Sequence, residues 1–232
     1  MVLALPLWVF TGFMLAQALV FALLEVLHSF GVSFDGVNPA LFNAAGGVVI
    51  YALAISIVLG LPWLIKKRRT TRAELGIQRL PTWLDLLWAP AGAVVYLILT
   101  TLVTAAAAAI LPFMNYHQAQ DTGFAQIATQ LEYILAFVSL VVVAPISEEI
   151  LFRGYLFGKL RKYVPVWGAV LITSLLFAIV HFQWNVGLDV FALSIVLCLL
   201  RVVSGSLWPS ILLHMLKNGI AFYFLFVNPG LL

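Results

Sequence analysis

The sequence predicts an all-α protein, a polytopic bundle of transmembrane helices. Of its 232 residues, 64% are hydrophobic and only 9% are charged, and the mean hydropathy is +1.11. A soluble domain carries about 25% charged residues, and a soluble core of this size could not bury so much apolar surface. In addition, long apolar runs recur along the whole chain and are separated by short polar or basic stretches. This is the pattern of membrane-spanning helices.

The apolar runs predict about seven spans, within a range of six to eight. We expect the first run to be a span and not a cleaved signal peptide, because no basic segment precedes it and it exceeds the roughly 15 apolar residues of a signal peptide. The expected spans are 3–30, 40–65, 84–111, 131–157, 164–182, 188–203 and 207–227. No internal repeat or linker separates them, so we expect one integral membrane domain over residues 1–232.

The basic residues predict the orientation of the spans. Nine of the twelve Lys and Arg lie in two stretches between expected spans, 66–79 and 159–162. Basic loops stay on the cytoplasmic side of a membrane, so both stretches and the N-terminus should be cytoplasmic, and the polar segment 112–130 should be external. This placement also explains the net charge of +3 without a nucleic-acid partner.

The segment 145–154, PISEEILFRG, places two carboxylates and an arginine in a very apolar part of the chain. An ionisable group at bilayer depth costs about 2.5 to 3.5 kcal/mol on insertion scales, so it normally pairs with another group or performs chemistry. On a helix, Glu149 and Arg153 are four residues apart and share a face, whereas Glu148 points about 100° away from Glu149. We therefore expect a structural Glu149–Arg153 pair and a Glu148 that faces a polar cavity and can act as a base.

Two later spans carry further polar side chains. Phe177 and His181 form an F-x-x-x-H pattern, and His214 and Asn218 form an H-x-x-x-N pattern, so the members of each pair share a helical face. Each pattern alone also fits a packing residue or an interhelical hydrogen bond. Together with Glu148 they supply a general base, its partners and a donor for an oxyanion, or else ligands for a divalent metal.

Some of these polar residues also have structural explanations. A helix break at Pro145 would let Ser147 cap a restarted helix, with both glutamates at its positive end. Arg201 and Lys217 could reach from helix ends to the membrane surface. The single cysteine, Cys198, is expected to be a packed residue in an apolar segment.

Three motifs, in this order and within expected spans, resemble the signature of the CAAX protease and bacteriocin-processing (Abi) family of intramembrane proteases, which includes the Ras-converting CAAX prenyl endopeptidases. The motifs are Glu148-Glu149-x-x-x-Arg153-Gly154, Phe177-x-x-x-His181 and His214-x-x-x-Asn218. The resemblance covers residues 143–222, and it includes the Ala-Pro before the glutamates and the Gly-Ser-Leu at 205–207.

The resemblance implies a membrane-embedded peptidase in a prokaryotic cell membrane, acting on a membrane-associated or prenylated, CAAX-type protein or peptide. Glu148 would activate water, and the other catalytic residues would be His181, His214 and Asn218. The residues that support this site would be Glu149, Arg153 and Phe177. The family has been argued both as metal-dependent and as metal-free. The site would therefore hold either no cofactor or one divalent metal such as zinc, bound by Glu148, His181 and His214. The strong zinc motif H-E-x-x-H is absent from the sequence.

Two alternatives to a peptidase remain open on the sequence. One is a non-catalytic membrane protein of the same fold, such as a bacteriocin-immunity factor or a scaffold. The other is a transporter, which the lack of an inverted repeat disfavours. A scaffold has no need of an unpaired carboxylate within the membrane, so the sequence favours the peptidase.

The orientation can be tested by labelling single cysteines introduced into the loops. We expect cysteines in 66–83 and 159–163 to react with a membrane-impermeant reagent only from the cytoplasmic side, and a Gln120→Cys variant, in the segment 112–130, only from the external side. Labelling of Gln120→Cys from the cytoplasmic side alone would overturn this orientation.

Overall fold

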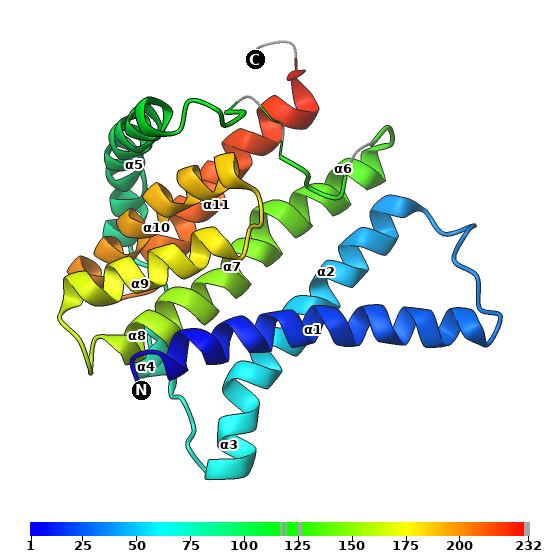
Figure 1. The fold of residues 1–232 in the computed structure, drawn as a ribbon, viewed down its shortest axis with the longest axis horizontal. Coiled ribbons are helices and arrows are strands. Elements are labelled where there is room, and N and C mark those ends of the chain that lie inside the picture. The colour runs from blue at the N-terminus through cyan, green and yellow to red at the C-terminus, as the bar shows by residue number, and fades with distance from the viewer. Residues whose placement is uncertain (117, 119, 125–126, 230–232) are drawn as a thin grey trace.

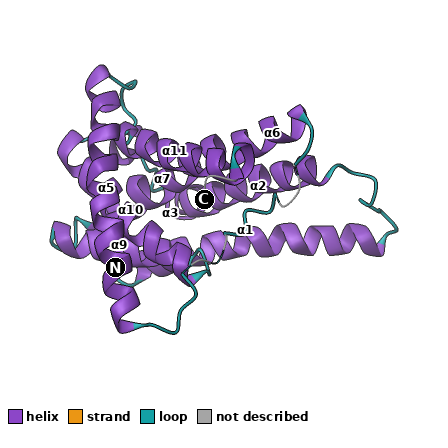
Figure 2. Cartoon of the chain, turned by 90° about the horizontal axis from the view of Figure 1, so that it is seen from above, coloured by secondary structure: helices purple, strands orange, loops and turns teal. Residues whose placement is uncertain are grey.

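The computed structural model describes residues 1–116, 118, 120–124 and 127–229, and within these ranges every regular element is a helix (Figure 2). The prediction of an all-α protein is therefore confirmed. In chain order the elements, with η marking π-helical stretches, are α1 (Ala4–Ser29), α2 (Pro39–Ile55), η1 (Ser56–Gly60), α3 (Leu61–Lys66), α4 (Arg72–Leu75), α5 (Trp83–Ile110), α6 (Gln130–Phe137), η2 (Val138–Val143), α7 (Ala144–Glu149), η3 (Ile150–Phe157), α8 (Gly158–Leu160), α9 (Val166–Ile179), α10 (Trp184–Ser204), α11 (Trp208–Phe222) and η4 (Tyr223–Val227).

Six continuous helices in the described part of the chain are long and apolar enough to cross a membrane. They are Ala4–Ser29, Pro39–Lys66, Trp83–Ile110, Gln130–Leu160, Trp184–Ser204 and Trp208–Val227. The seventh expected span corresponds to α9, which has only 14 residues and is shorter than the roughly 20 needed to span the hydrocarbon core. The number of spans thus falls at the lower end of the predicted range.

The helix that carries the two glutamates lies at the centre of the fold. Elements α6, η2, α7, η3 and α8 form one continuous helix, drawn in green in Figure 1. On one side α2 packs against α6, η2 and α7, and on the other α11 packs against η2 and α7. Elements α9 and α10 contact η3. The motifs on α9 and α11 therefore come to the same central helix.

The expected helix break at Pro145 is wrong. Residues 143 to 149 remain helical, so Ser147 lies inside the helix and does not begin one. The reason is the π-helical stretch η2, which ends two residues before the proline. A proline in a regular helix clashes with the carbonyl one turn earlier, and a wider turn is a common way of accommodating such a disturbance.

The interior of the bundle is most tightly packed around η3. Leu151, Leu156 and Phe157 are fully buried there, and they join apolar side chains from α1, η1, α9 and α10 in one core cluster. Lipid tails are as apolar as leucine, so burial in such a bundle stabilises it mainly through close packing and not through exclusion of water. This dense region supports the segment that carries the charged motif.

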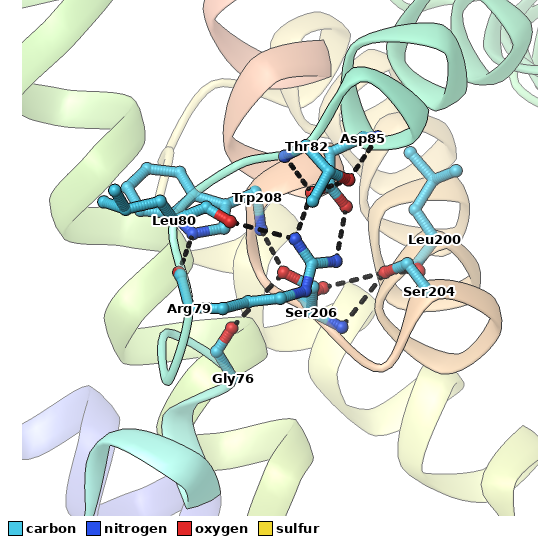
Figure 3. Close-up of polar contacts among 9 residues, drawn as sticks. All are labelled: Gly76, Arg79, Leu80, Thr82, Asp85, Leu200, Ser204, Ser206 and Trp208. Carbon is cyan, nitrogen blue, oxygen red and sulfur yellow. Dashed lines mark hydrogen bonds and ion pairs between the residues drawn. The ribbon is translucent and has the colours of Figure 1, made fainter.

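The loop between α4 and α5 is fastened to the turn between α10 and α11 (Figure 3). The Trp208 indole donates to the Arg79 carbonyl at 2.7 Å, and the Leu207 amide donates to the Gly76 carbonyl at 2.9 Å. The Arg79 guanidinium pairs with the buried Asp85 carboxylate, with Nη2 2.9 Å from Oδ1 (Figure 3). These contacts fix the beginning of α11, the helix that carries the third motif.

Arg201 takes part in this anchoring, and the expectation that it reaches the membrane surface is wrong. Its side chain is buried, with Nη2 3.4 Å from the Glu74 carbonyl oxygen. Its guanidinium lies against Gly76, where an added Cβ would be 2.5 Å from the Arg201 Cζ. Gly76 also has a φ of +84°, a conformation that favours glycine. Loop 76–79 therefore covers the Arg201 guanidinium near the end of α10 and separates it from the surface.

Candidate active site

The central helix presents its two glutamates to different surroundings. The Glu149 side chain is fully buried, whereas that of Glu148 is 13% exposed and lines a cavity of about 240 Å³. Adjacent helical positions differ in direction by about 100°, which separates the two carboxylates as the sequence predicted. One glutamate therefore faces the packed interior and the other faces a space that can admit small molecules.

The Glu149 carboxylate binds two side chains through one oxygen. Arg153 Nη1 and His214 Nδ1 each lie 2.9 Å from Glu149 Oε1. The predicted Glu149–Arg153 pair is thus present, and the Arg153 guanidinium also stacks 4.2 Å from the centre of the Phe177 ring. A carboxylate oxygen accepts hydrogen bonds, so Nδ1 of His214 carries a hydrogen. This fixes the orientation of the His214 ring.

The opposite edge of His214 faces Glu148. Its Nε2 lies 3.8 Å from Glu148 Oε2, which is longer than a hydrogen bond. The other carboxylate oxygen, Oε1, accepts a hydrogen bond of 2.5 Å from the Tyr51 hydroxyl. Tyr51 therefore holds one oxygen of Glu148 and leaves the other beside the imidazole.

His181 is oriented by the backbone of its own motif. Its Nδ1 lies 2.7 Å from the Phe177 carbonyl oxygen. A carbonyl can only accept, so Nδ1 carries the hydrogen and the lone pair is on Nε2. The fully buried Phe177 ring contacts both imidazoles edge to face, with ring centres 4.9 Å from His181 and 5.9 Å from His214. Phe177 thus acts as a rigid spacer between the two histidines.

The position of Asn218 depends on the π-helical stretch of the central helix. In η2 the Ala144 amide donates to the Ser139 carbonyl, five residues earlier. In the same register the next donor would be the nitrogen of Pro145, which has no hydrogen. The Leu140 carbonyl instead accepts a 2.9 Å hydrogen bond from Asn218 Nδ2. Pro145 therefore creates the acceptor that holds the asparagine of the third motif.

These residues converge on a single space. The cavity of about 240 Å³ is lined by the four residues that the sequence indicated as catalytic, namely Glu148, His181, His214 and Asn218. The three supporting residues lie behind them, buried in the bundle: Glu149, Arg153 and Phe177. A carboxylate, two imidazoles and an amide in one partly enclosed cavity can transfer protons and stabilise negative charge.

Part of the chain is similar to known proteins. Residues 130–220 match the family model described as Rce1-like, type II CAAX prenyl endopeptidase. Residues 130–220 are thus similar to the Rce1-like CAAX prenyl endopeptidases. The resemblance that the sequence motifs indicated is therefore confirmed, and the chain is a multi-pass membrane protein related to membrane peptidases.

Three individual relatives each match less than half of the chain. The membrane-embedded CAAX protease MroQ of Staphylococcus aureus is 30% identical over 109 residues, which is 44% of this chain and 43% of MroQ. The putative membrane peptidase YdiL of Bacillus subtilis is 34% identical over 77 residues, 33% of this chain and 32% of YdiL. An uncharacterized 24.3 kDa protein of Escherichia coli is 36% identical over 89 residues, 36% of this chain and 41% of that protein.

The chain thus matches less than half of the length of these relatives. No solved structure matches the chain. The matched segment, residues 130–220, contains the residues of all three motifs, but it does not contain Tyr51, which comes from α2.

The sequence did not indicate the roles of three residues at or next to the cavity. Lys217 does not reach the membrane surface as expected, because its Nζ lies 3.2 Å from Asp189 Oδ2 and it lines the cavity. Asp189 was not singled out, although its other oxygen accepts hydrogen bonds from Tyr96 at 2.5 Å and Thr100 at 2.9 Å. Tyr51 was missed as well. The only available signal was a tyrosine hydroxyl within an apolar span, where it needs a partner.

The described side chains that could bind a metal are not grouped into a metal site. Among the side chains that the structure describes, no three His, Cys, Asp or Glu gather in a way that could hold a metal ion. His181 and His214 bond to the protein through Nδ1, and Tyr51 engages only Oε1 of Glu148, so both Nε2 atoms and Glu148 Oε2 have no such bond to the described residues. Hydrogen bonds through the second ring nitrogen are usual for metal-binding histidines, so these contacts do not argue against a metal. The metal site formed by Glu148, His181 and His214 therefore stays a prediction from the sequence.

The two glutamates should differ in their effect on stability. Glu149→Gln replaces a buried carboxylate that neutralises Arg153, and breaking such a pair costs about 3 to 5 kcal/mol. We expect a clear fall in the melting temperature of the protein in detergent for Glu149→Gln and little change for Glu148→Gln, whose side chain faces the cavity. Equal melting temperatures for wild type and Glu149→Gln would contradict the structural role of the buried pair.

Proposed function

We propose that the protein is an intramembrane endopeptidase that hydrolyses a peptide bond in a membrane-associated or prenylated, CAAX-type protein or peptide. The observation that carries the proposal is the convergence of Glu148, His181, His214 and Asn218 on one cavity. The family of residues 130–220 and the printed name of MroQ support the same class of reaction. The expected partners are membrane lipid and a lipidated or membrane-associated substrate.

In the proposed mechanism Glu148 is the general base. A water molecule between Glu148 and His181 gives one proton to the carboxylate, and its oxygen forms a bond to the carbonyl carbon of the substrate. His181 Nε2 accepts a hydrogen bond from the other water hydrogen, which stays on the oxygen, because the Nδ1 hydrogen of His181 is donated to the Phe177 carbonyl. General-base assistance of this kind contributes about 100- to 10,000-fold in rate.

The developing oxyanion would be stabilised from α11. Glu149 accepts from His214 Nδ1, so a hydrogen on Nε2 of the same ring would point into the cavity and could donate to the oxyanion. Asn218 uses one amide hydrogen on Leu140 and has a second hydrogen to donate. One such donor is worth about 2.7 to 4 kcal/mol in the transition state.

Collapse of the tetrahedral intermediate completes the reaction. The bond between the carbonyl carbon and the peptide nitrogen breaks, and Glu148 returns its proton to the leaving nitrogen. The products are a carboxylic acid and an amine, and the base is regenerated. Tyr51 holds Glu148 Oε1 throughout, so the proton is taken up and released at Oε2.

The proposal predicts that Glu148→Gln abolishes turnover without unfolding the protein. The amide keeps the size and polarity of glutamate but cannot accept the proton, so the rate should fall at least about 100-fold. The measurement is cleavage of prenylated and unprenylated CAAX-type peptides by purified protein, followed by mass spectrometry. Glu25→Gln, which changes an exposed glutamate of α1, is the matched control and should retain activity.

The other outcomes of this experiment separate the remaining explanations. No cleavage by folded wild-type protein would favour a non-catalytic immunity factor or scaffold, or a transporter. Metal analysis and chelation of the same preparation test the metal-free mechanism, and we expect activity to persist after chelation. Stoichiometric zinc that disappears in His181→Ala, with activity that returns only when zinc is added, would contradict that mechanism.

A further inference from the structure

A second and larger cavity adjoins the catalytic one. It has a volume of about 810 Å³ and lies between the α1–α2 pair and the η2–α7 part of the central helix. The two cavities share lining residues at their boundary: Tyr51, Asp121, Thr122, Leu140, Ala144 and His181. The larger cavity therefore reaches the same side chains that surround Glu148. We call it the access cavity.

Tyr51 stands at the boundary between the two cavities. Its ring lines both of them, and its hydroxyl is bonded to Glu148 Oε1. A molecule that passes from the access cavity to the base therefore comes close to Tyr51. Tyr51 belongs to α2 and lies outside the matched segment 130–220, so the boundary is formed jointly by that segment and the part of the chain before it.

The lining of the access cavity suits a peptide better than a hydrocarbon chain. Its polar side chains include the amides Gln17, Gln118 and Asn43, the last of which also donates to the Gly123 carbonyl. The described residues that line it include one carboxylate, Asp121, but no Lys, Arg or Glu. Within a membrane the N–H and C=O groups of an extended chain need hydrogen-bond partners. Amide side chains donate and accept, so they can satisfy both groups without selecting for charge.

We propose that the access cavity is the substrate-binding site next to Glu148, where an uncharged, extended segment of the substrate peptide lies before it passes Tyr51 to the base. This inference rests on the proposed peptidase function and deepens it, because it names the surface that holds the chain. It assigns α2, which has no part in the three motifs, a direct role in substrate binding.

Two adjacent glycines of α2 provide a matched test. A Cβ added at Gly46 or at Gly47 would meet no atom within 4 Å, so either position accepts a larger side chain. Gly47 lines the access cavity and Gly46 does not. We expect Gly47→Leu to raise the KM for a peptide substrate about tenfold, equal to about 1.4 kcal/mol of binding. The value of kcat should stay near that of the wild type, and Gly46→Leu should leave both constants unchanged.

A second measurement does not depend on turnover. In the Glu148→Gln background, a Gly47→Cys thiol should react with a maleimide reagent, and an uncleaved peptide should slow that reaction. At a peptide concentration ten times its dissociation constant, the expected slowing is about elevenfold. The native Cys198 is fully buried, so labelling reports on the introduced cysteine.

The possible outcomes separate this inference from the proposed function. A wild-type protein that cleaves the peptide, while Gly47→Leu behaves like Gly46→Leu and the peptide does not protect Gly47→Cys, would overturn the access cavity and leave the peptidase function standing. A folded wild-type protein that cleaves no peptide would overturn the proposed function and, with it, this inference. A raised KM for Gly47→Leu alone, together with protection of Gly47→Cys, would support both.

Discussion

The site depends on one buried carboxylate, that of Glu149. Its Oε1 accepts from Arg153 one helical turn away and from His214 on α11, at 2.9 Å in each case. A charge in this position would be very costly alone, so the three groups stabilise one another only as a set. The set joins the central helix to α11 and fixes the histidine edge that faces Glu148. The neighbouring glutamate can then remain exposed to a cavity.

A second constraint originates in the backbone. Pro145 supplies no amide hydrogen, and the π-helical stretch before it leaves the Leu140 carbonyl to be satisfied by the Asn218 side chain. Proline usually breaks a helix. In this protein it leaves a backbone carbonyl of a continuous helix free to accept a hydrogen bond from a side chain of another helix. Functional sites often contain such π-helical irregularities. Here the irregularity precedes the two glutamates in the same helix.

The sequence was sufficient for six of the seven expected spans and for singling out the motif residues, because both depend on local properties. Apolar runs define the helices, and charges inside those runs are rare enough to stand out, as Glu148, Glu149 and Arg153 did. It was insufficient for contacts between distant segments. Helical periodicity shows which face a residue occupies but not which helix packs against that face. The bond from Tyr51 to Glu148 and the burial of Arg201 under the 76–79 loop could not be predicted for that reason, and the single-domain assignment stays a prediction.

The central claim is that the carboxylate at position 148 is the base that activates water. Chemical rescue tests it most directly. Glu148→Ala leaves space next to the Tyr51 hydroxyl, and a small carboxylate such as formate can enter the cavity and take over the proton transfer. We expect formate to restore peptide cleavage to Glu148→Ala in proportion to its concentration, and not to Glu149→Ala, whose lost carboxylate is structural. Cleavage by Glu148→Ala at the wild-type rate without formate would contradict the account.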